Sequence, residues 1–514
     1  MPVRVVSADE SAQRDQAAID SGTPSRTLMQ RAGAGAARAI TDKFGSLLSD
    51  GVQVFTGSGN NGGDGWVVAG ALARAGYAVR VTEAGAAKTL DAVAERDAAL
   101  EILSARTGAE KADAEAAPGV VVDALLGTGF RGEPHGIVQE SIARVNELRA
   151  RGSSVASLDI PSGLDASTGA HGECVHADLT VSFGGIKRGT LLARDCCGEI
   201  VTIDIGLVAH GREADSRLPL LIDRAWVAAT IPPLRYDSHK GQRKHLAIVG
   251  GAKGMGGAAV LAARASLRSG IGLVRAVVAQ ENTTALLLST PSALVSAWSR
   301  DRSEVERDLG EWADALVVGP GMGKSSESRE ILELVLQVSQ QPVVLDADAL
   351  NLFENEVSSL RDHLRGRQAL LTPHPAEFAR LAGMDVKTVL AERFDVGSAL
   401  AADLSATILL KGTPTVIFAP TGERLVSARG TAALGTGGSG DILAGIAGAL
   451  LAQTGNAVSA GACAAWIHGK AAELCGYVRG TTLEDVLYAL PRAWNENDPP
   501  VEPPVLTRLP AVAQ

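Results

Sequence analysis

Short apolar runs alternate with amphipathic segments along the first part of the chain. The apolar runs predict strands, and the segments whose apolar positions recur with a helical period predict helices. The expected strands are Val52–Phe55, Ala78–Val81, Val120–Ala124, Val155–Ile160, Leu179–Ser182 and Glu199–Ile203. The expected helices are Ala8–Ala18, Leu28–Lys43, Gly65–Arg74, Ala92–Ser104 and Gln139–Ala150. Strands separated by helices indicate a parallel sheet covered on both faces.

The same rhythm begins again after a stretch around Asp215 that is rich in Gly, Pro and mixed charge. The expected strands beyond it are His245–Val249, Leu273–Val278, Ala315–Val318, Val343–Asp346, Ala369–Thr372, Thr407–Lys411 and Thr415–Ala419. An apolar helix is expected at Ile442–Gln453, directly after a second glycine-rich loop. Because 514 residues exceed what one core usually serves, we expect two α/β domains, residues 1–215 and 216–497. The Pro-rich tail, residues 498–514, is expected to be disordered.

Composition narrows the class of protein. The net charge of −10 argues against nucleic acid or an anionic membrane as a partner. The acidic N-terminus lacks the apolar core of a signal peptide, and no apolar run reaches the length of a membrane span, so we expect a soluble, cytoplasmic protein. The five cysteines include no C-x-x-C pair, and the nine histidines show no metal-ligand spacing. We therefore expect reduced thiols, and neither a disulfide frame nor a zinc site.

The first glycine-rich loop raises the question of a nicotinamide nucleotide. Gly57, Gly59 and Gly62 fit G-x-G-x-x-G between a strand and a helix, and Glu83 lies near the end of the next strand. This pattern is typical of NAD-dependent dehydrogenases, in which the acid binds a ribose. The stretch from Asn60 is richer than that fingerprint requires, because two adjacent amides and a carboxylate follow the glycines. A dehydrogenase also needs a second substrate site, and the sequence offers no sign of one.

Polar loops follow three strands of the first domain. They are "GSGNNGGDG", "DALLGTGFRGE" from Asp123 to Glu133, and "DIPSGLD" from Asp159 to Asp165. Any one of them alone would be a tight turn or a helix cap. Because the carboxyl ends of parallel strands meet at one edge of a sheet, three such loops together predict a ligand site. Their backbone N–H groups suit a pyrophosphate, and the Asn, Ser and Asp oxygens suit a hard monovalent cation.

The motifs "GSGNNGGDG", "VVDALLGTGFRG" and "LDIPSGLDASTG" resemble the signature of the NAD(P)H-hydrate epimerase family, over about the first 210 residues. The resemblance implies a Rossmann-like three-layer domain whose substrate is a hydrated NADH or NADPH. The residues implied to contact that substrate are Asn60, Asn61, Gly62, Gly63, Asp64, Gly127, Thr128, Gly129, Phe130, Arg131, Gly132, Glu133 and Asp159. Potassium (K+) ligation is implied for Asn61, Asp123 and Ser162. Asp159 is the candidate base for epimerisation, with a helix-capping or cation-binding role left open.

The second domain also places polar residues after its strands. The stretches "VVGPGMGKS", "VVLDADALN", "LLTPHPAEF" and "LLKGTPTVI" each follow or end a strand, and "GTGGSGD" opens the long apolar helix. Asp441 lies in the first turn of that helix, where the helix dipole favours its ionised form. An ionised carboxylate beside a phosphate can accept a hydroxyl proton, although an ordinary helix-stabilising acid is the alternative.

These stretches, together with "SHKG" and "GGAKGMGGAAVLAARASLRSGIGLV", resemble the ribokinase-like ADP/ATP-dependent NAD(P)H-hydrate dehydratase family from about Ser238 to Trp494. The resemblance implies a C-terminal ribokinase-like α/β domain that uses ADP or ATP with Mg2+, with Glu377 near the metal and the phosphate. The residues implied to face the hydrated dinucleotide are Ala258, Gly321, His374 and Asp441. The residues implied to hold the adenine nucleotide are Lys411, Gly412, Thr413, Pro414, Thr415 and Gly440.

Three positions depart from that family's pattern. Glycine is usual where Lys244 and Ala376 stand, and Asn-Pro-Gly is usual near Thr431–Ala433. The last departure adjoins the phosphate loop and leaves the choice between ADP and ATP open.

The two resemblances together predict a bifunctional repair enzyme for hydrated NADH and NADPH. The first domain would interconvert the R and S epimers, and the second would dehydrate the S epimer. Alternatives are a vitamin- or sugar-type kinase in the second domain and a non-catalytic binding module in the first. His374 disfavours the kinase, in which Asn is common, and the retained carboxylates Asp123 and Asp159 disfavour the binding module. The expected partners are small molecules and a second copy of the chain.

Overall fold

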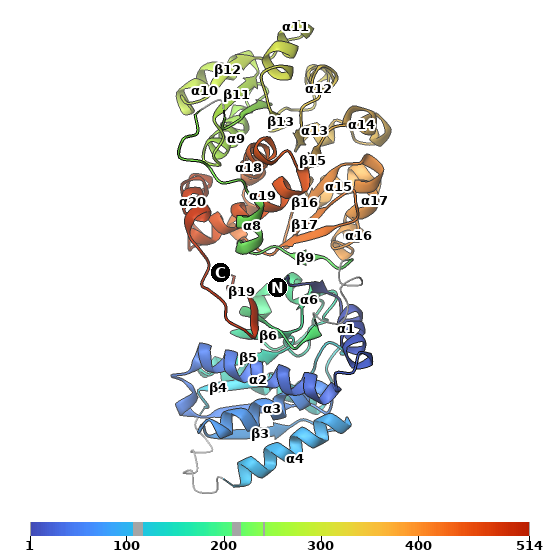
Figure 1. Cartoon of the computed structure of the whole chain (residues 1–514), viewed down its shortest axis with the longest axis vertical. Coiled ribbons are helices and arrows are strands. Elements are labelled where there is room, and N and C mark those ends of the chain that lie inside the picture. Colours follow the sequence, from blue (N-terminus) through green and yellow to red (C-terminus); the bar gives the residue numbers. More distant parts are fainter. Residues whose placement is uncertain (1, 106–116, 208–216, 240–241, 513–514) are drawn as a thin grey trace. The chain divides into compact units, whose positions relative to one another are not determined.

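The computed structural model describes residues 2–105, 117–207, 217–239 and 242–512, and the chain divides into two compact units (Figure 1). The first unit combines Met1–Leu220 with Pro499–Val512, and the second spans Leu221–Asp498. The boundary expected at Asp215 lies outside the described residues, and the division falls a few residues later.

The first unit is built on one sheet whose strands follow the order β19-β8-β6-β5-β4-β2-β3. Neighbouring strands are parallel except β19, which runs antiparallel to β8. A separate two-stranded parallel pair joins β1 and β7. The strands are β1 (Val5–Val6), β2 (Val52–Thr56), β3 (Val79–Glu83), β4 (Val120–Ala124), β5 (Ser154–Leu158), β6 (Leu179–Phe183), β7 (Ile186–Lys187), β8 (Glu199–Ile203) and β19 (Val505–Leu509).

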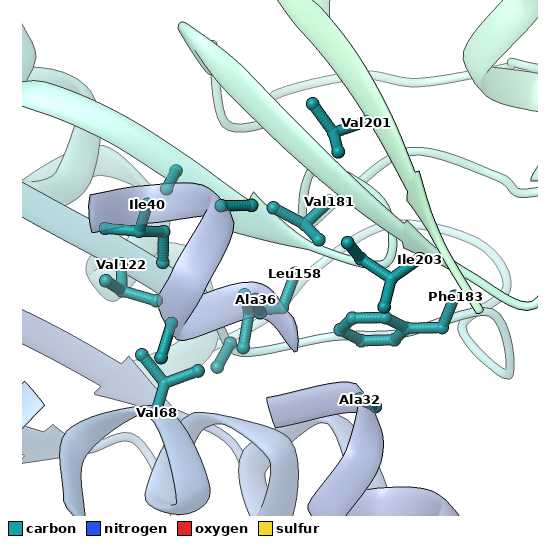
Figure 2. Close-up of a cluster of buried hydrophobic side chains, with 14 of the residues drawn as sticks. Ala32, Ala36, Ile40, Val68, Val122, Leu158, Val181, Phe183, Val201 and Ile203 are labelled. Atoms are coloured by element: carbon teal, nitrogen blue, oxygen red, sulfur yellow. The ribbon is translucent and has the colours of Figure 1, made fainter. Parts of the chain in front are cut away.

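Helices cover both faces of this sheet. They are α1 (Ala8–Asp20), α2 (Ser25–Phe44), α3 (Asn60–Arg74), α4 (Leu90–Ser104), α5 (Ile137–Ala150) and α6 (Arg188–Leu192), with short 3₁₀ turns η1 (Leu48–Asp50) and η2 (Arg194–Cys196). Side chains alternate along β4, so Val120 and Val122 pack with α2 and α3, whereas Val121 packs with α5. Figure 2 shows the first of these two cores, in which α2 and α3 meet the strands. The three-layer α/β domain expected from the sequence is confirmed.

The Pro-rich tail was expected to be disordered, but its residues 505–509 form β19 at the edge of the first unit's sheet. Val505 and Leu509 are buried, and the strand pairs with β8 from Ile203 to Ile200. The alternating apolar positions of "VLTRL" are the pattern of a half-buried strand, and the prolines before it only set where the strand begins.

The second unit contains a sheet in the order β12-β11-β10-β13-β14-β15-β16-β17-β18-β9. Pairing is parallel from β12 to β16 and antiparallel from β16 through β17 to β18. The strands are β9 (Leu220–Leu221), β10 (His245–Val249), β11 (Leu273–Val278), β12 (Leu294–Ala297), β13 (Ala315–Val318), β14 (Val343–Leu345), β15 (Ala369–Leu371), β16 (Thr407–Leu410), β17 (Thr415–Phe418) and β18 (Arg424–Ser427).

The helices of the second unit again lie on both faces of its sheet. Leu409 of β16 lies against Gly461 of α19, while Phe418, which pairs with Ile408, lies against Gly397 of α17, so these two helices cover opposite faces. The α-helices are α8 (Arg224–Thr230), α9 (Gly256–Leu267), α10 (Thr283–Ser289), α11 (Arg302–Val305), α12 (Ser326–Val338), α13 (Asp348–Asn351), α14 (Val357–Leu364), α15 (Pro375–Ala382), α16 (Val386–Ala391), α17 (Gly397–Leu404), α18 (Ser439–Thr454), α19 (Ala457–Leu474) and α20 (Leu483–Asn495). Single turns are η4 (Gln280–Asn282), η5 (Glu306–Gly310) and η6 (Ala432–Gly435).

The apolar helix α18 is a core helix. Every side chain from Ile442 to Ala452 is buried, and the helix packs against α9, α19 and the central strands. Within the described part of the chain, no helix is both long and apolar enough to cross a bilayer.

Candidate functional site

A cavity of about 610 Å³ opens at the carboxyl edge of the first unit's sheet. Its walls come from the segments that follow β2, β4 and β5 and from helices α1 and α2. In the sheet, β2 has β3 on one side and β4 on the other, so successive strands are added first on one side of β2 and then on the other. Such a switch in strand order is where parallel α/β sheets usually bind their ligands.

The glycine-rich stretch after β2 is mostly helix, because α3 begins at Asn60 and not at Gly65 as expected. Two glycines permit this early start. A Cβ on Gly57 would lie 1.9 Å from the Leu125 carbonyl oxygen, and one on Gly62 would lie 1.9 Å from the Gly57 carbonyl oxygen. The first turn of α3 therefore sits directly on the strand ends, and its free N–H groups lie at the edge of the cavity.

Asp123 is fully buried at the end of β4 and accepts four hydrogen bonds. The donors are the Ser162 hydroxyl (2.6 Å), the Ser162 backbone N–H (2.9 Å), the Ser157 hydroxyl (2.8 Å) and the Leu125 backbone N–H (3.2 Å). Burial raises the pKa of Asp123, and the hydrogen bonds from Ser162, Ser157 and Leu125 oppose that rise. These bonds tie the loop after β5 to the end of β4.

Asn61 meets the same group of atoms from α3. Its Nδ2 donates to the Leu126 carbonyl oxygen at 2.8 Å, and the Leu126 N–H donates to the Ser162 hydroxyl at 2.9 Å. The side-chain oxygen of Asn61 is buried and has no hydrogen-bond partner among the residues that the structure describes. An unpartnered buried oxygen costs about 1–3 kcal/mol, so this atom calls for a donor or a cation. The structure thus brings Asn61, Asp123 and Ser162 together around the Leu126 peptide.

Asp159 lies in the cavity wall and is paired with a lysine that the sequence did not single out. Its carboxylate Oδ1 accepts a hydrogen bond from the Lys187 Nζ, which also donates to the Phe183 carbonyl oxygen at 2.8 Å. Lys187 is 1% exposed, so the pair is held in a poorly solvated place. Asp159 also has a φ of 65°, a conformation that is costly for an aspartate and recurs at functional sites.

Two further carboxyl groups, Asp15 of α1 and Asp64 of α3, line the same cavity. Burial raises the pKa of Asp64 well above its usual value, and repulsion from Asp159 and Asp15 adds to the rise. Burial also raises the pKa of Asp15 to about 6, with Lys187 opposing and Asp159 reinforcing the rise. Burial therefore favours the protonated form of Asp64, which can donate a hydrogen bond, whereas Asp159 accepts one from Lys187. Two carboxyl groups in such different surroundings can supply a donor and an acceptor.

The remaining residues expected to contact the dinucleotide divide into two groups. Gly127, Thr128, Gly129, Phe130 and Asn60 line the cavity. Within the described residues, Gly62, Gly63, Arg131, Gly132 and Glu133 do not line it. The Arg131 guanidinium donates to the carbonyl oxygens of Thr128 and Phe130, both at 2.8 Å, so it shapes the loop that does line the cavity.

Glu83, the acid of the dehydrogenase fingerprint, is engaged elsewhere. Both of its carboxylate oxygens accept from the Arg96 guanidinium, at 3.0 and 3.2 Å. Glu83 is not one of the described residues that line the cavity. The geometry therefore gives no support to the dehydrogenase hypothesis.

The second unit gathers charged side chains at the carboxyl ends of its central strands. The Lys411 Nζ lies 2.9 Å from the Asp346 Oδ1 and 3.7 Å from the Glu377 Oε2. Burial lowers the pKa of Lys411, but attraction to Asp346 and Glu377 outweighs it, so the net pKa is raised and the lysine is a cation. The Thr372 hydroxyl also donates to the Asp346 Oδ1, at 2.7 Å.

His374 is the N-cap of α15, and its two ring nitrogens have separate roles. The Nδ1 accepts from the backbone N–H groups of Ala376 (3.1 Å) and Glu377 (3.3 Å), while the Nε2 lies 3.4 Å from the Glu377 Oε1. This geometry requires a neutral ring with its proton on Nε2, and burial lowers the pKa of His374 in the same sense. The ring is exposed on its outer side and can meet a ligand.

Asp441, in the first turn of α18, faces the same charged group. Burial raises the pKa of Asp441 to about 7, with repulsion from Asp346 and Asp348 adding to the rise and Lys411 opposing it. A carboxylate with a pKa near the working pH is suited to act as a general base.

Gly440 precedes Asp441 and lies beside the charged group. A Cβ on this residue would lie 3.4 Å from the Lys411 Nζ and 3.9 Å from the Asp346 Oδ2. Any larger side chain would occupy the space in front of the lysine, at the N-terminus of α18, where an anion would bind.

The loop from Lys411 to Thr415 is held by an arginine that the sequence did not indicate. The buried Arg393 donates through one nitrogen to the carbonyl oxygens of Lys411 (3.2 Å) and Pro414 (3.0 Å). Gly412, at a φ of 140°, passes so close that a Cβ would lie 2.4 Å from the same nitrogen. Arg393 was not predictable because it lies between α16 and α17, far from the loop in sequence.

The other two residues expected to face the ligand, Ala258 and Gly321, lie against each other. Gly321 has a φ of 57°, and a Cβ on it would lie 2.9 Å from the Ala258 Cβ. This contact places the loop after β13 against the first turn of α9.

The three departures from the family pattern have different structural consequences. Lys244 keeps the conformation that favours glycine, with a φ of 68°, and its Nζ pairs with Asp314 at 2.9 Å. Ala376 lies in the first turn of α15, where the backbone is helical and needs no glycine. Thr431 is the N-cap of η6, with its hydroxyl accepting from the Ala433 N–H at 3.3 Å. Two residues of "SHKG", at positions 240 and 241, lie outside the described residues.

Two family models match the chain, one in each unit. Residues 25–189 match a model described as "YjeF-related protein N-terminus", and residues 246–491 match one described as "NAD(P)H-hydrate dehydratase".

Curated relatives match over nearly the whole length. A bifunctional NAD(P)H-hydrate repair enzyme of Moorella thermoacetica is 33% identical over 93% of this chain and 93% of its own. The enzyme of the same description from Escherichia coli is 32% identical over 96% and 95%. A solved structure of an ADP/ATP-dependent NAD(P)H-hydrate dehydratase from Bacillus subtilis, co-crystallised with ATP and Mg2+, is 28% identical, with a TM-score of 0.46 over 53% of this chain and 96% of that one.

Proposed function

The chain belongs to the family of bifunctional NAD(P)H-hydrate repair enzymes, and on that premise we propose that it repairs hydrated NADH and NADPH at two separate active sites. The first unit interconverts the R and S epimers of the hydrate, and the second dehydrates the S epimer at the expense of ADP or ATP. The observation that carries the proposal is that each unit has its own lysine–aspartate pair with a raised-pKa carboxyl group beside it, at the carboxyl edge of its own sheet.

In the first unit, the free N–H groups of α3 and the loop from Gly127 to Phe130 bind the dinucleotide. The charges of the cavity permit an anionic ligand, because Asp159 is paired with Lys187 and burial favours the uncharged form of Asp64. The nicotinamide end lies toward these carboxyl groups, away from the phosphates.

Epimerisation requires either loss and return of the hydroxyl or transient opening of the hydrated ring. Asp159 takes up and returns the proton on either route, and the hydrogen bond from Lys187 orients its carboxylate. Asp64 serves as the complementary donor, because burial raises its pKa and so favours its protonated form.

Potassium fits the group of oxygens around the Leu126 peptide. The unpartnered side-chain oxygen of Asn61 is the atom that most needs a cation, and the Asp123 carboxylate and the Ser162 hydroxyl lie in the same hydrogen-bonded group. Such oxygen ligands suit a hard monovalent ion. When bound, K+ would fix the ends of α3 and of the loop after β5 relative to each other.

In the second unit, Asp441 accepts the proton of the substrate hydroxyl as that oxygen takes a phosphoryl group from the nucleotide. The ring nitrogen then supplies the electron pair that expels phosphate, and proton loss from the neighbouring carbon restores the double bond. Lys411 and the N-terminus of α18 neutralise the transferred phosphoryl group. Gly440 leaves the space that this group needs.

Magnesium fits the carboxylates of this edge, which include Asp346, Asp348 and Glu377. They would supply oxygen ligands and hold a metal-bound nucleotide, whose phosphates the metal partly neutralises. We also propose that the second unit uses either ADP or ATP, that the protein is cytoplasmic and that it forms a homo-oligomer.

Separate mutation of the two sites tests the proposal. Asp159→Asn should stop epimerisation while the S epimer is repaired at the normal rate, and Asp441→Asn should stop dehydration while epimerisation continues. Chromatography of the two epimers and NADH absorbance follow the two reactions. A mixture of the two variants should restore complete repair, since each keeps the site that the other lacks. A stable phosphorylated product in place of NADH would instead make the second unit a kinase.

A further inference from the structure

Three side chains of types that can bind a metal ion lie close together in the first unit, outside the cavity walls. They are His171, Cys174 and Cys196, and one ligand atom from each lies within 4.8 Å of the others. The two sulfurs are 3.5 Å apart, Cys174 Sγ is 3.6 Å from the His171 Nδ1, and Cys196 Sγ is 3.7 Å from the His171 Nε2. Both cysteines are buried, and the histidine is exposed.

These spacings are close to those around a tetrahedral zinc ion. With Zn–S and Zn–N bonds of about 2.3 and 2.05 Å, tetrahedral angles place two sulfurs about 3.8 Å apart and a sulfur and a nitrogen about 3.6 Å apart. The cysteines therefore need to separate only slightly, and a small rotation of the ring brings one nitrogen to both sulfurs.

The surroundings of His171 select the nitrogen that is free to bind. Its Nδ1 lies 3.1 Å from the Gly172 carbonyl oxygen, so a proton on Nδ1 is donated there and Nε2 keeps its lone pair. A backbone carbonyl that fixes the tautomer in this way is the usual support for a metal-binding histidine.

We propose that His171, Cys174 and Cys196 form a site for Zn2+, with a fourth position open to solvent on the exposed side of His171. Two thiolates and one imidazole are ligands that zinc prefers, and three protein ligands with one open position is a known arrangement. The sequence predicted reduced thiols and no zinc site. All five cysteines are described and free, but the fold brings Cys196 of η2 to a histidine and a cysteine from the loop before β6, a grouping without a motif.

The proposed zinc site takes His171 and Cys174 from the segment that follows β5, which also carries Asp159 and Ser162. His171 forms a bridge with Leu164, and the Val175 N–H donates to the Ser162 carbonyl oxygen at 2.9 Å. Gly163 packs so tightly here that a Cβ would lie 3.0 Å from the Cys174 Cα. A metal bound to Cys174 and Cys196 would therefore hold the turn at Ser162 against η2.

Zinc titration of the full-length protein tests the site. The reduced protein, freed of metal with a chelator, is titrated with Zn2+ in competition with a chromophoric chelator. We expect one equivalent to bind with a Kd at or below about 1 μM, a free energy of about −8 kcal/mol. Cys174→Ser, Cys196→Ser and His171→Ala should each weaken binding at least about 100-fold. Cys197→Ser is the matched control, since its buried sulfur contacts the Ala193 carbonyl oxygen at 3.2 Å instead, and it should bind like the wild type.

Two further measurements keep the proposal testable if a cysteine variant folds poorly. Co2+ in place of Zn2+ should give a thiolate-to-cobalt charge-transfer band in the wild type. One equivalent of Zn2+ should raise the melting temperature of the wild type but not that of His171→Ala. His171 is exposed, so this variant should fold normally. Equal zinc affinity in the wild type and in His171→Ala, or a Cys174–Cys196 disulfide with no metal bound in the reduced-purified protein, would overturn the site.

Discussion

Asp441→Asn should make the protein less active and more stable at the same time. The substitution keeps the size of the side chain but removes its charge and its capacity to accept a proton. Loss of a general base costs about 100- to 10,000-fold in rate, so dehydration should nearly cease.

The gain in stability follows from the raised pKa. The folded pKa of Asp441 is about 7, against an ordinary value of 3.8, because burial and the Asp346 carboxylate disfavour its charge. Between these values the unfolded chain has released a proton that the folded chain keeps, so the stability of the wild type falls as pH rises through this window. A pKa difference of one between the folded and unfolded chains changes the free energy of unfolding by about 1.4 kcal/mol. The raised pKa of Asp441 therefore lowers the free energy of unfolding by about 4 kcal/mol above pH 7. Asparagine does not bear that cost.

Urea unfolding of the two proteins at about pH 5 and about pH 8 measures the effect, because the advantage of Asp441→Asn should grow by about 2–3 kcal/mol between them. Tryptophan fluorescence is a suitable probe, since Trp226, Trp298, Trp312, Trp466 and Trp494 all lie in the second unit and only one tryptophan of the sequence lies outside it. The control is Asp362→Asn on α14, whose side chain is 71% exposed and whose effect should not depend on pH. A variant that is less stable than the wild type at about pH 8, or an advantage that does not change with pH, would refute this account of Asp441.

Three other substitutions test other parts of the structure. Replacing K+ by Na+ should slow epimerisation and leave dehydration unchanged, and Asn61→Ala should abolish the response, whereas an equal rate in both salts would contradict the cation site. Gly440→Val should weaken nucleotide binding in calorimetric titration at least about tenfold, because its side chain would enter the space in front of Lys411; unchanged affinity would rule out a phosphate there. Lys244→Gly should raise the free energy of unfolding by up to about 1 kcal/mol, because it relieves a φ of 68° at the loss of one partly exposed ion pair with Asp314, and a loss of stability on urea unfolding would show the ion pair to be the larger effect.

The sequence predicted the central strands well because parallel strands buried on both faces are continuous apolar runs. β4, β6, β8, β10, β11 and β13 lie within a residue of their expected bounds. The short pair of β1 with β7 was missed, and so were β12, β18 and β9 toward the two ends of the second sheet, because strands of two to four residues carry too little periodicity.

The start of α3 was missed for a different reason. A turn that contains Asn60, Asn61, Gly62 and Gly63 has low helix propensity, so local preference argues against a helix there. The close approach of Gly57 to Leu125, directly after β4, and of Gly62 to Gly57 decides the outcome. Only glycine allows these contacts, and the one with Leu125 is a tertiary effect.

Candidate residues that lie within sequence motifs could be named from the sequence, whereas those that only the fold brings together could not. The cation group around Asp123 comes from three motifs that were each visible in the sequence. Asp15 and Lys187 belong to no motif, and they reach Asp159 only because β1 pairs with β7 and leads directly into α1. A lysine that is 1% exposed cannot be told from a surface lysine without the fold.

The strand β19 has a consequence for synthesis on the ribosome. The first unit's sheet takes this edge strand from residues 505–509, which are translated only after the whole second unit. Until then β8 presents an unpaired edge, which is a site for mispairing between nascent chains. A premature stop codon anywhere in the second half of the message would therefore damage the epimerase-like unit as well as the unit that it interrupts. The chain folds as one domain inserted within another, and the earlier half is completed last.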